Sequence, residues 1–228
     1  MAHLRTMFGP EPRNLVVMLQ ELRDESLEAI LEDEWAQQNF ALSDTDPPYS
    51  DYAYPEFFDE ELNLQRSRYF TLMMVSRNLP ISNCFRVPML TEMERDALVV
   101  DIPVSEDHHG PEASSSKRSL RLCTTHLESL YQGKDLRFRQ LAQVAALLKG
   151  DDSRHGEGQK QICGGLVCGD MNSGDPSEHS IHRAPEVGLR DVWEDESAPT
   201  PPALKPFQKD LTYGKARGNT WGYQSSRA

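Results

Sequence analysis

The sequence has no apolar segment long enough to cross a membrane, and it has too little positive charge to balance its acidic residues. Met1 to Pro12 lacks the apolar core of a signal peptide, and no stretch approaches the length of a membrane span. We therefore expect an intracellular protein, cytoplasmic or nuclear, with no membrane partner. The 228 residues include 24 Lys and Arg against 36 Asp and Glu, a net charge of −12. This balance disfavours a general nucleic-acid-binding surface, which is normally basic.

Cysteine is scarce, and the motifs of several enzyme classes are missing. None of the four cysteines belongs to a Cys-x-x-Cys pair, and three lie in apolar runs typical of strands. This pattern favours buried free thiols over disulfides or a zinc site, and it indicates a reducing compartment. The sequence also has no Walker motif and no Gly-x-Ser-x-Gly motif, so neither a P-loop nor a nucleophile elbow is indicated.

The residues that are present predict one α/β domain over 1–228. An apolar share of 38% and a mean hydropathy of −0.61 fit a folded domain that carries polar insertions. Strands are predicted at 14–19, 40–42, 69–76, 84–90, 97–104, 120–125 and 162–168, and helices at 24–38 and 135–149. Flexible loops are expected near 43–66, 105–118, 150–161 and 199–217. Two sheets with helices outside them would suit this order of elements.

Polar side chains follow two of the predicted strands. Glu21 comes after the first strand, where its carboxylate can bind a metal ion or can simply open a helix in solvent. His126 follows the strand at 120–125, and its imidazole can either bond a phosphate oxygen or serve the packing. Ser129 can donate to the same phosphate or cap a helix. Glu128 is expected at the surface or in a salt bridge.

The strongest pair is Asp170 and Asn172, which lie two residues apart after an apolar strand. Both side chains can face one cleft, where Asp170 would accept a proton from an attacking water and Asn172 would orient that water or donate to a phosphoryl oxygen. An Asx turn uses the same residue types, so a purely local role is the alternative. Because three such motifs each follow a predicted strand, in order along the chain, we favour a catalytic cleft.

Two further residues are less decisive. Trp221 can pack in the core or can line a substrate face, where an indole stacks on bases or other aromatic groups. Arg95 precedes a predicted strand together with Asp96, and the pair is expected to form an ion pair with no assigned chemistry.

The order of these motifs resembles the endonuclease/exonuclease/phosphatase superfamily, and most of all its tyrosyl-DNA phosphodiesterase 2-like branch. The motifs that carry the likeness are Leu19-Gln20-Glu21, Thr125-His126-Leu127-Glu128-Ser129, Gly169-Asp170-Met171-Asn172, Asp191-Val192-Trp193 and Thr220-Trp221. The resemblance implies a four-layered αββα sandwich and a hydrolase that uses Mg²⁺, or Mn²⁺ in its place. The implied substrate is a phosphodiester or phosphomonoester, for example a nucleic-acid end or a 5′-tyrosyl-DNA linkage, which would place the protein in DNA repair.

The resemblance also implies a role for each candidate residue. Glu21 would hold the metal ion, His126 and Ser129 would bind the phosphate, and Asp170 with Asn172 would activate water. Family members carry two more motifs, an Asn on a strand ahead of the Gln-Glu strand and a His in a late Ser-Asp-His segment, and neither occurs here. We therefore expect a domain that is incomplete at both termini. The alternative is a catalytically impaired fragment or a non-catalytic binding remnant of the same family.

Overall fold

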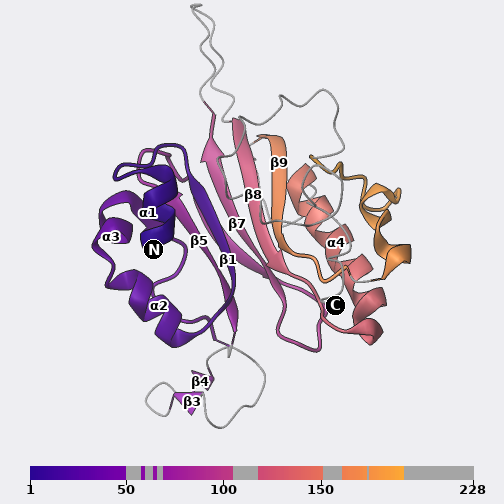
Figure 1. The fold of residues 1–228 in the computed structure, drawn as a ribbon. Helices are drawn as coiled ribbons and strands as arrows, with labels where there is room; N and C mark the ends of the chain where they lie inside the picture. Colours follow the sequence, from indigo (N-terminus) through magenta and orange to yellow (C-terminus); the bar gives the residue numbers. More distant parts are fainter. Residues whose placement is uncertain are drawn as a thin grey trace, which may run out of the picture.

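Two β-sheets pack against each other in the computed structural model, and helices lie on the outer side of each sheet (Figure 1). The structure describes residues 1–49, 58–59, 64–65, 69–104, 118–150, 161–173 and 175–192. Within these ranges the first sheet has three strands in the order β1-β5-β2, and the second has four in the order β6-β7-β8-β9. The predicted mixture of strands and helices around two sheets is thus confirmed for the described residues.

The first sheet is antiparallel, and β5 (Phe70–Ser76) is its central strand. Its neighbours are β1 (Val16–Leu22) and β2 (Phe40–Leu42). Every residue of β5 is buried, because this apolar run is covered on both faces. The sheet therefore provides a rigid centre from which the ends of β1 project.

The helices of the N-terminal part of the chain lie on the outer face of this sheet (Figure 1). α1 (Ala2–Phe8) lies where no element is expected from the sequence, and it is followed by Gly9, whose carbonyl accepts the Trp35 indole N–H at 3.0 Å. The single helix predicted at 24–38 is wrong, because the chain forms α2 (Asp24–Leu31) and then α3 (Glu34–Asn39). Asp33 separates them by accepting the backbone N–H of Ala36 at 2.9 Å, which makes it the N-cap of a new helix.

The second sheet is mixed. β6 (Asn83–Pro88), β7 (Asp96–Pro103) and β8 (Arg118–His126) are antiparallel neighbours, whereas β8 and β9 (Gln161–Asp170) are parallel. A parallel pair needs a crossover, and α4 (Lys134–Lys149) supplies it. Because β8 and β9 run in the same direction, their carboxyl ends meet at one edge of the sheet.

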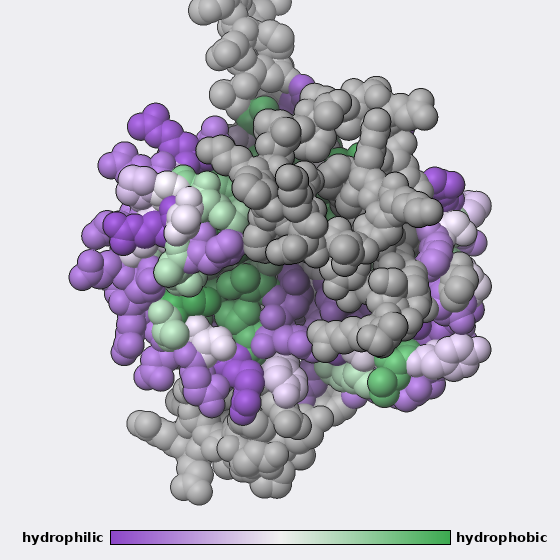
Figure 2. Space-filling model, viewed as in Figure 1, coloured by the Kyte–Doolittle hydropathy of each residue, from purple (hydrophilic) through white to green (hydrophobic). Residues whose placement is uncertain are grey.

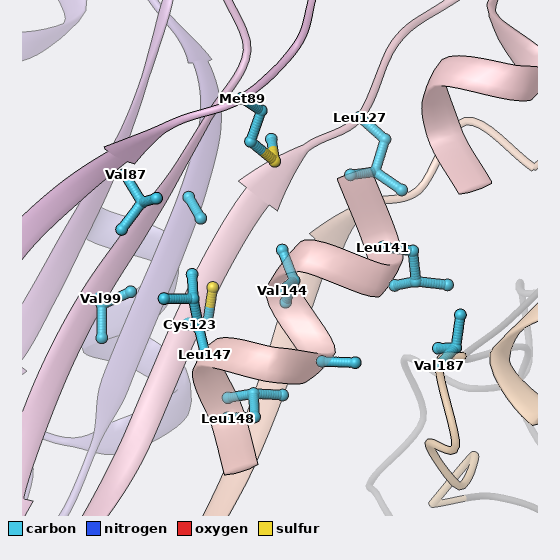
Figure 3. Packing of buried hydrophobic residues seen from close by; sticks show 12 residues of the cluster. Val87, Met89, Val99, Cys123, Leu127, Leu141, Val144, Leu147, Leu148 and Val187 are labelled. Carbon is cyan, nitrogen blue, oxygen red and sulfur yellow. The ribbon is translucent and has the colours of Figure 1, made fainter. Parts of the chain in front are cut away.

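α4 packs on the outer face of the second sheet through a core cluster. Figure 3 shows this cluster, in which Leu141, Val144 and Leu147 of the helix join Val99 of β7 and Cys123 of β8. The four cysteines are free, as the sequence predicts. Their predicted burial is wrong for three of them, since only Cys123 is buried and the other thiols are exposed.

A further core cluster lies between the two sheets. Met73 and Val75 of β5 meet Leu98 and Val100 of β7, and all four side chains are 0–1% exposed. A hydrogen bond from Gln20 Nε2 to Thr124 Oγ1 at 2.9 Å also joins β1 to β8. The two sheets are therefore held in a fixed relation near the ends of β1 and β8.

The remaining described elements are short. β3 (Phe58–Asp59) and β4 (Leu64–Gln65) form a two-stranded pair within the loop predicted at 43–66. The loops predicted at 105–118, 150–161 and 199–217 fall almost entirely outside the described residues. No helix in the described part of the chain is long and apolar enough to cross a membrane. The described surface in Figure 2 is mostly hydrophilic, with hydrophobic side chains showing mainly near the middle of this face.

Candidate active site

Glu21 lies at a bulge near the end of β1. The pairing of β1 with β5 runs from Leu19 opposite Leu72 to Leu22 opposite Phe70, so β1 contains one extra residue at this point. Glu21 takes a positive φ of 55°, which is costly for a non-glycine residue and is typical of functional positions. The bulge leaves the Glu21 side chain 67% exposed while its neighbour Gln20 reaches into the interface between the sheets.

His126 and Asp170 end neighbouring parallel strands and are partners in the register of β8 and β9. His126 Nε2 lies 3.9 Å from Asp170 Oδ2 and 4.0 Å from Glu21 Oε1. The imidazole is nearly buried, at 5% exposure, whereas the Asp170 carboxylate is 53% exposed. The structure thus brings two predicted carboxylates, one from each sheet, to one nitrogen of the predicted imidazole.

Gly169 allows this close approach of the two strands. A Cβ atom placed on Gly169 would lie 1.9 Å from the carbonyl oxygen of Thr125, a distance that no side chain can tolerate. The residue that precedes Asp170 must therefore be glycine for β8 and β9 to end side by side.

Hydrogen bonds in the turn after β9 connect the remaining candidate residues. The backbone N–H of Asn172 donates to Asp170 Oδ1 at 2.9 Å, so the Asx turn considered from the sequence is present. Asn172 Nδ2 donates to the Leu127 carbonyl at 2.8 Å and to Ser129 Oγ at 3.0 Å. Both amide protons of Asn172 are used inside the protein in this arrangement, which leaves its carbonyl oxygen as the atom able to meet a water.

Arg95 is the site residue that sequence reasoning missed. Its guanidinium lies 3.2 Å from His126 Nδ1 through Nη1, and its Nη2 donates to Ser129 Oγ at 3.0 Å. The signal that could have found it is strand pairing, because β7 and β8 are antiparallel and Ala97 lies opposite Thr125. Continuing that register places Asp96 opposite His126 and Arg95 at the next position, opposite Leu127, so Arg95 lies next to the segment that carries His126.

Glu128 is buried, at 1% exposure, so the predicted surface position is wrong, and among the described residues its carboxylate is held by hydrogen bonds and not by an ion pair. Oε2 accepts the Thr91 hydroxyl at 2.7 Å and the Gln140 amide at 3.2 Å, and Oε1 accepts the backbone N–H of Glu92 at 3.1 Å. Its backbone carbonyl also accepts a hydrogen bond from Arg137 at 3.0 Å. Glu128 therefore connects the segment that follows His126 to the loop before β7 and to α4.

Burial and the neighbouring charges both shift the pKa of the His126 imidazole. Burial lowers the pKa of His126, and the Arg95 guanidinium lowers it further, while the carboxylates of Asp170 and Glu21 partly oppose the shift. Burial likewise lowers the pKa of Arg95, against the effect of the surrounding carboxylates. Because the net shift of the His126 pKa is downward, the imidazole is predominantly neutral at pH 7.

A pocket opens beside this cluster and combines charges of both signs with an aromatic ring. Its lining includes Glu21, Tyr69, Thr71, Arg95, Asp96 and His126. Trp221, the predicted substrate-facing residue, lies outside the described residues, as does Trp193. Among the described residues, the candidate site therefore offers two exposed carboxylates, a neutral imidazole, a hydroxyl and a guanidinium.

Comparison with family models and with curated protein sequences gave no match. Solved structures are similar to the described fold. D. rerio TDP2 complexed with single strand DNA product is 20% identical, and the match covers 85% of this chain and 59% of that chain with a TM-score of 0.51. The human Nocturnin catalytic domain with bound sulfate anion is 14% identical, with 78% and 59% coverage and a TM-score of 0.50. The chain shares the endonuclease/exonuclease/phosphatase fold.

A humanized D. rerio TDP2 gives the same result, at 22% identity, 78% and 57% coverage and a TM-score of 0.50. The chain spans less than two thirds of the length of each of these structures. These structural matches establish a mixed α/β architecture with two sheets, which agrees with the resemblance seen in the sequence.

Proposed function

We propose that the chain is a magnesium-dependent phosphoesterase that hydrolyses a phosphodiester or a phosphomonoester by direct attack of water. The observation that carries the proposal is the meeting of Glu21, His126 and Asp170, with two carboxylate oxygens at 4.0 and 3.9 Å from one imidazole nitrogen. The fold shared with TDP2 and Nocturnin supports the same class of chemistry. We infer that the described sheets are part of a four-layered sandwich of that type.

Glu21 is the residue that we assign to the metal ion, Mg²⁺ or Mn²⁺. Among the described residues no group of three or more His, Cys, Asp or Glu side chains has the geometry of a metal site. A hard ion that keeps most of its water needs only one or two carboxylates, so the exposed Glu21 fits Mg²⁺ better than zinc. When bound, such an ion would neutralise charge on the phosphoryl and leaving oxygens.

The other candidate residues would activate the water and bind the phosphate. Asp170 Oδ1 is held by the Asn172 N–H, so Oδ2, the oxygen that faces His126, would accept the proton of the attacking water. The water oxygen would bond to phosphorus while the bond from phosphorus to the leaving oxygen breaks. His126 Nε2 and the Ser129 hydroxyl would donate to the phosphoryl oxygens, and Asn172 would hold Ser129 in place. Trp221 stays a predicted substrate contact.

The substrate class that we infer is a phosphodiester at a nucleic-acid end, which would serve DNA repair. The TDP2 structure of similar fold was determined with a single-strand DNA product. A net charge of −12 does not favour a long nucleic acid, because an extended contact with phosphates needs a basic surface. A single terminal phosphate held by local groups such as Arg95 and a metal ion avoids that requirement.

The test is a hydrolysis assay on the purified chain. Bis-p-nitrophenyl phosphate and a 5′-phosphotyrosyl oligonucleotide serve as substrates, with Mg²⁺, with EDTA, and with Mg²⁺ added back. We expect turnover that EDTA abolishes and Mg²⁺ restores. Glu21→Gln should abolish turnover or raise the Mg²⁺ concentration that half-saturates it. Glu28→Gln, the same change on an exposed position of α2, should behave like the parent chain.

Turnover that does not depend on a metal ion would remove Glu21 from its assigned role. A chain that unfolds cooperatively but hydrolyses neither substrate would support the alternative of a non-catalytic binding remnant. A silent chain without a cooperative transition would support an impaired fragment.

A further inference from the structure

Arg95 enters the site from the loop between β6 and β7, and this loop is fastened to the segment that carries His126. The buried Glu128 carboxylate accepts the Thr91 hydroxyl at 2.7 Å, and Thr91 Oγ1 in turn accepts the backbone N–H of Arg95 at 3.1 Å. Gln140 of α4 donates to the same carboxylate at 3.2 Å. A carboxylate buried to this degree normally needs such partners, and here they fix the backbone from which the guanidinium projects.

The guanidinium touches two of the groups assigned to the phosphate. Nη1 lies 3.2 Å from His126 Nδ1, and Nη2 donates to Ser129 Oγ at 3.0 Å. Its buried Nε has no hydrogen-bond partner among the residues that the structure describes. Apart from a contact of Nη2 with Met93 Sδ at 3.9 Å, the hydrogen bonds of the guanidinium thus go to His126 and Ser129.

The chemistry of a guanidinium decides which atoms of these groups remain available. Arginine has only donors, so His126 Nδ1 must accept, and a neutral imidazole then carries its proton on Nε2. That nitrogen is the one that faces Glu21 and Asp170. Ser129 Oγ accepts from both Arg95 and Asn172, which leaves its own hydroxyl proton free to donate outward.

We propose that Arg95 is a positioning residue of this site, which holds His126 as the Nε2–H tautomer and orients the Ser129 hydroxyl so that both donate to a phosphoryl oxygen. The buried Glu128–Thr91 contact presents Arg95 for this task. The kinetic consequence rests on the proposed phosphoesterase function, whereas the tautomer can be observed without any turnover.

The first measurement is the tautomer of His126 in the full chain labelled with ¹⁵N-histidine. Long-range ¹H–¹⁵N spectra distinguish a protonated from an unprotonated ring nitrogen, and His126→Gln identifies the resonances among the seven histidines. The parent chain should show Nε2 protonated and Nδ1 unprotonated. Arg95→Met should give a mixture of tautomers, and Arg95→Lys should keep Nε2–H, because an ammonium group also only donates.

The matched control is Arg77→Met, which removes a guanidinium at the opposite end of β5 from the site, where it donates to the Gln37 carbonyl. It should leave the His126 spectrum unchanged. If Arg95→Met does not fold, Glu128→Gln carries the same test, because it keeps the guanidinium but loosens its loop. A parent chain with Nδ1–H would overturn the proposal, and so would an undisturbed Nε2–H in Arg95→Met or, where Arg95→Met does not fold, in Glu128→Gln.

The second measurement is kinetic. With bis-p-nitrophenyl phosphate, Arg95→Met should lower kcat/KM by about 10- to 100-fold in the parent chain, since a small misplacement of catalytic groups has effects of this size. The same substitution should have little effect in the His126→Gln background, because Arg95 acts largely through His126. An equal loss in both backgrounds would contradict the positioning role. If the parent chain shows no turnover, the proposed function fails and the tautomer measurement alone decides the role of Arg95.

Discussion

The two carboxylate oxygens of Asp170 have different surroundings. A substitution can therefore remove the basic carboxylate and still keep the hydrogen bond of the turn. Oδ1 accepts the Asn172 backbone N–H at 2.9 Å, and Oδ2 lies 3.9 Å from His126 Nε2. Asp170→Asn keeps an oxygen acceptor for the turn but removes the basic carboxylate. We predict a loss of hydrolysis of about 10²- to 10⁴-fold, with little change in the urea midpoint. Initial rates and urea unfolding followed by circular dichroism measure the two quantities.

The control is the same substitution at Asp175, which forms a second turn of this kind. Asp175 Oδ1 accepts the backbone N–H of Ser177 at 2.8 Å, but Asp175 lies outside the site assigned to chemistry. Asp175→Asn should leave hydrolysis intact. If Asp170→Asn turned over substrate near the parent rate, Asp170 could not be the group that accepts the proton of water.

Cys123 provides a prediction that depends on pH and not on substrate. Burial raises the pKa of its thiol to about 12, so almost none of it is thiolate at pH 8. Iodoacetamide should therefore label the exposed Cys163 in the folded protein while leaving Cys123 unmodified, even when the pH is raised to about 10. In concentrated urea both thiols should react. Peptide mass spectrometry measures this, and equal labelling of both thiols in the folded state would contradict the buried position.

At the residue scale the sequence located the candidates that follow strands, because the end of a strand can be recognised from apolar runs alone. His126 and Asp170 are of this kind. Arg95 could not be found in this way, because its place beside His126 depends on the pairing of β7 with β8. Glu128 was placed wrongly for a related reason, since its hydrogen-bond partners lie far away in the sequence.

At the scale of elements, the parallel pair β8 and β9 explains why glycine precedes Asp170. A Cβ on Gly169 would meet the Thr125 carbonyl oxygen at 1.9 Å, whereas a Cβ on Gly164 of the same strand would lie 3.5 Å from Leu120 Cδ1, an ordinary contact. We predict that Gly169→Ala lowers the free energy of unfolding by about 1–3 kcal/mol or more and impairs hydrolysis, because the ends of the strands must move apart.

Gly164→Ala is the matched control and should change both quantities little. Urea unfolding and initial rates provide the comparison, and equal stability of the two variants would show that the strands can separate without loss.

The lengths of most elements could be predicted from apolar periodicity, but their irregularities could not. The strand predicted at 14–19 continues to Leu22 in the structure, and its bulge places Glu21 inside β1. The break between α2 and α3 was missed because the apolar spacing continues through Asp33, whose capping role appears only in its bond to Ala36. Local polar contacts of this kind redirect the chain without altering its hydrophobic pattern.

For the molecule as a whole, the core between the sheets is the feature on which the site depends. Leu98 of β7 is 1% exposed in the cluster that it shares with Met73 of β5. We predict that Leu98→Ala lowers the free energy of unfolding by about 2–5 kcal/mol. Leu90→Ala, the same change at a side chain that is 59% exposed, should stay within about 0.5 kcal/mol of the parent. Urea unfolding measures both, and similar values would mean that the inter-sheet core contributes little.

The spacing of the two acidic groups around His126 is set by how the layers are stacked, since Glu21 belongs to one sheet and Asp170 to the other. A shift of one sheet relative to the other would change the distance between Glu21 and Asp170 without any substitution at either carboxylate. Substitutions at Met73, in the core between the sheets, are therefore expected to change that spacing while they leave every polar group of the candidate site intact.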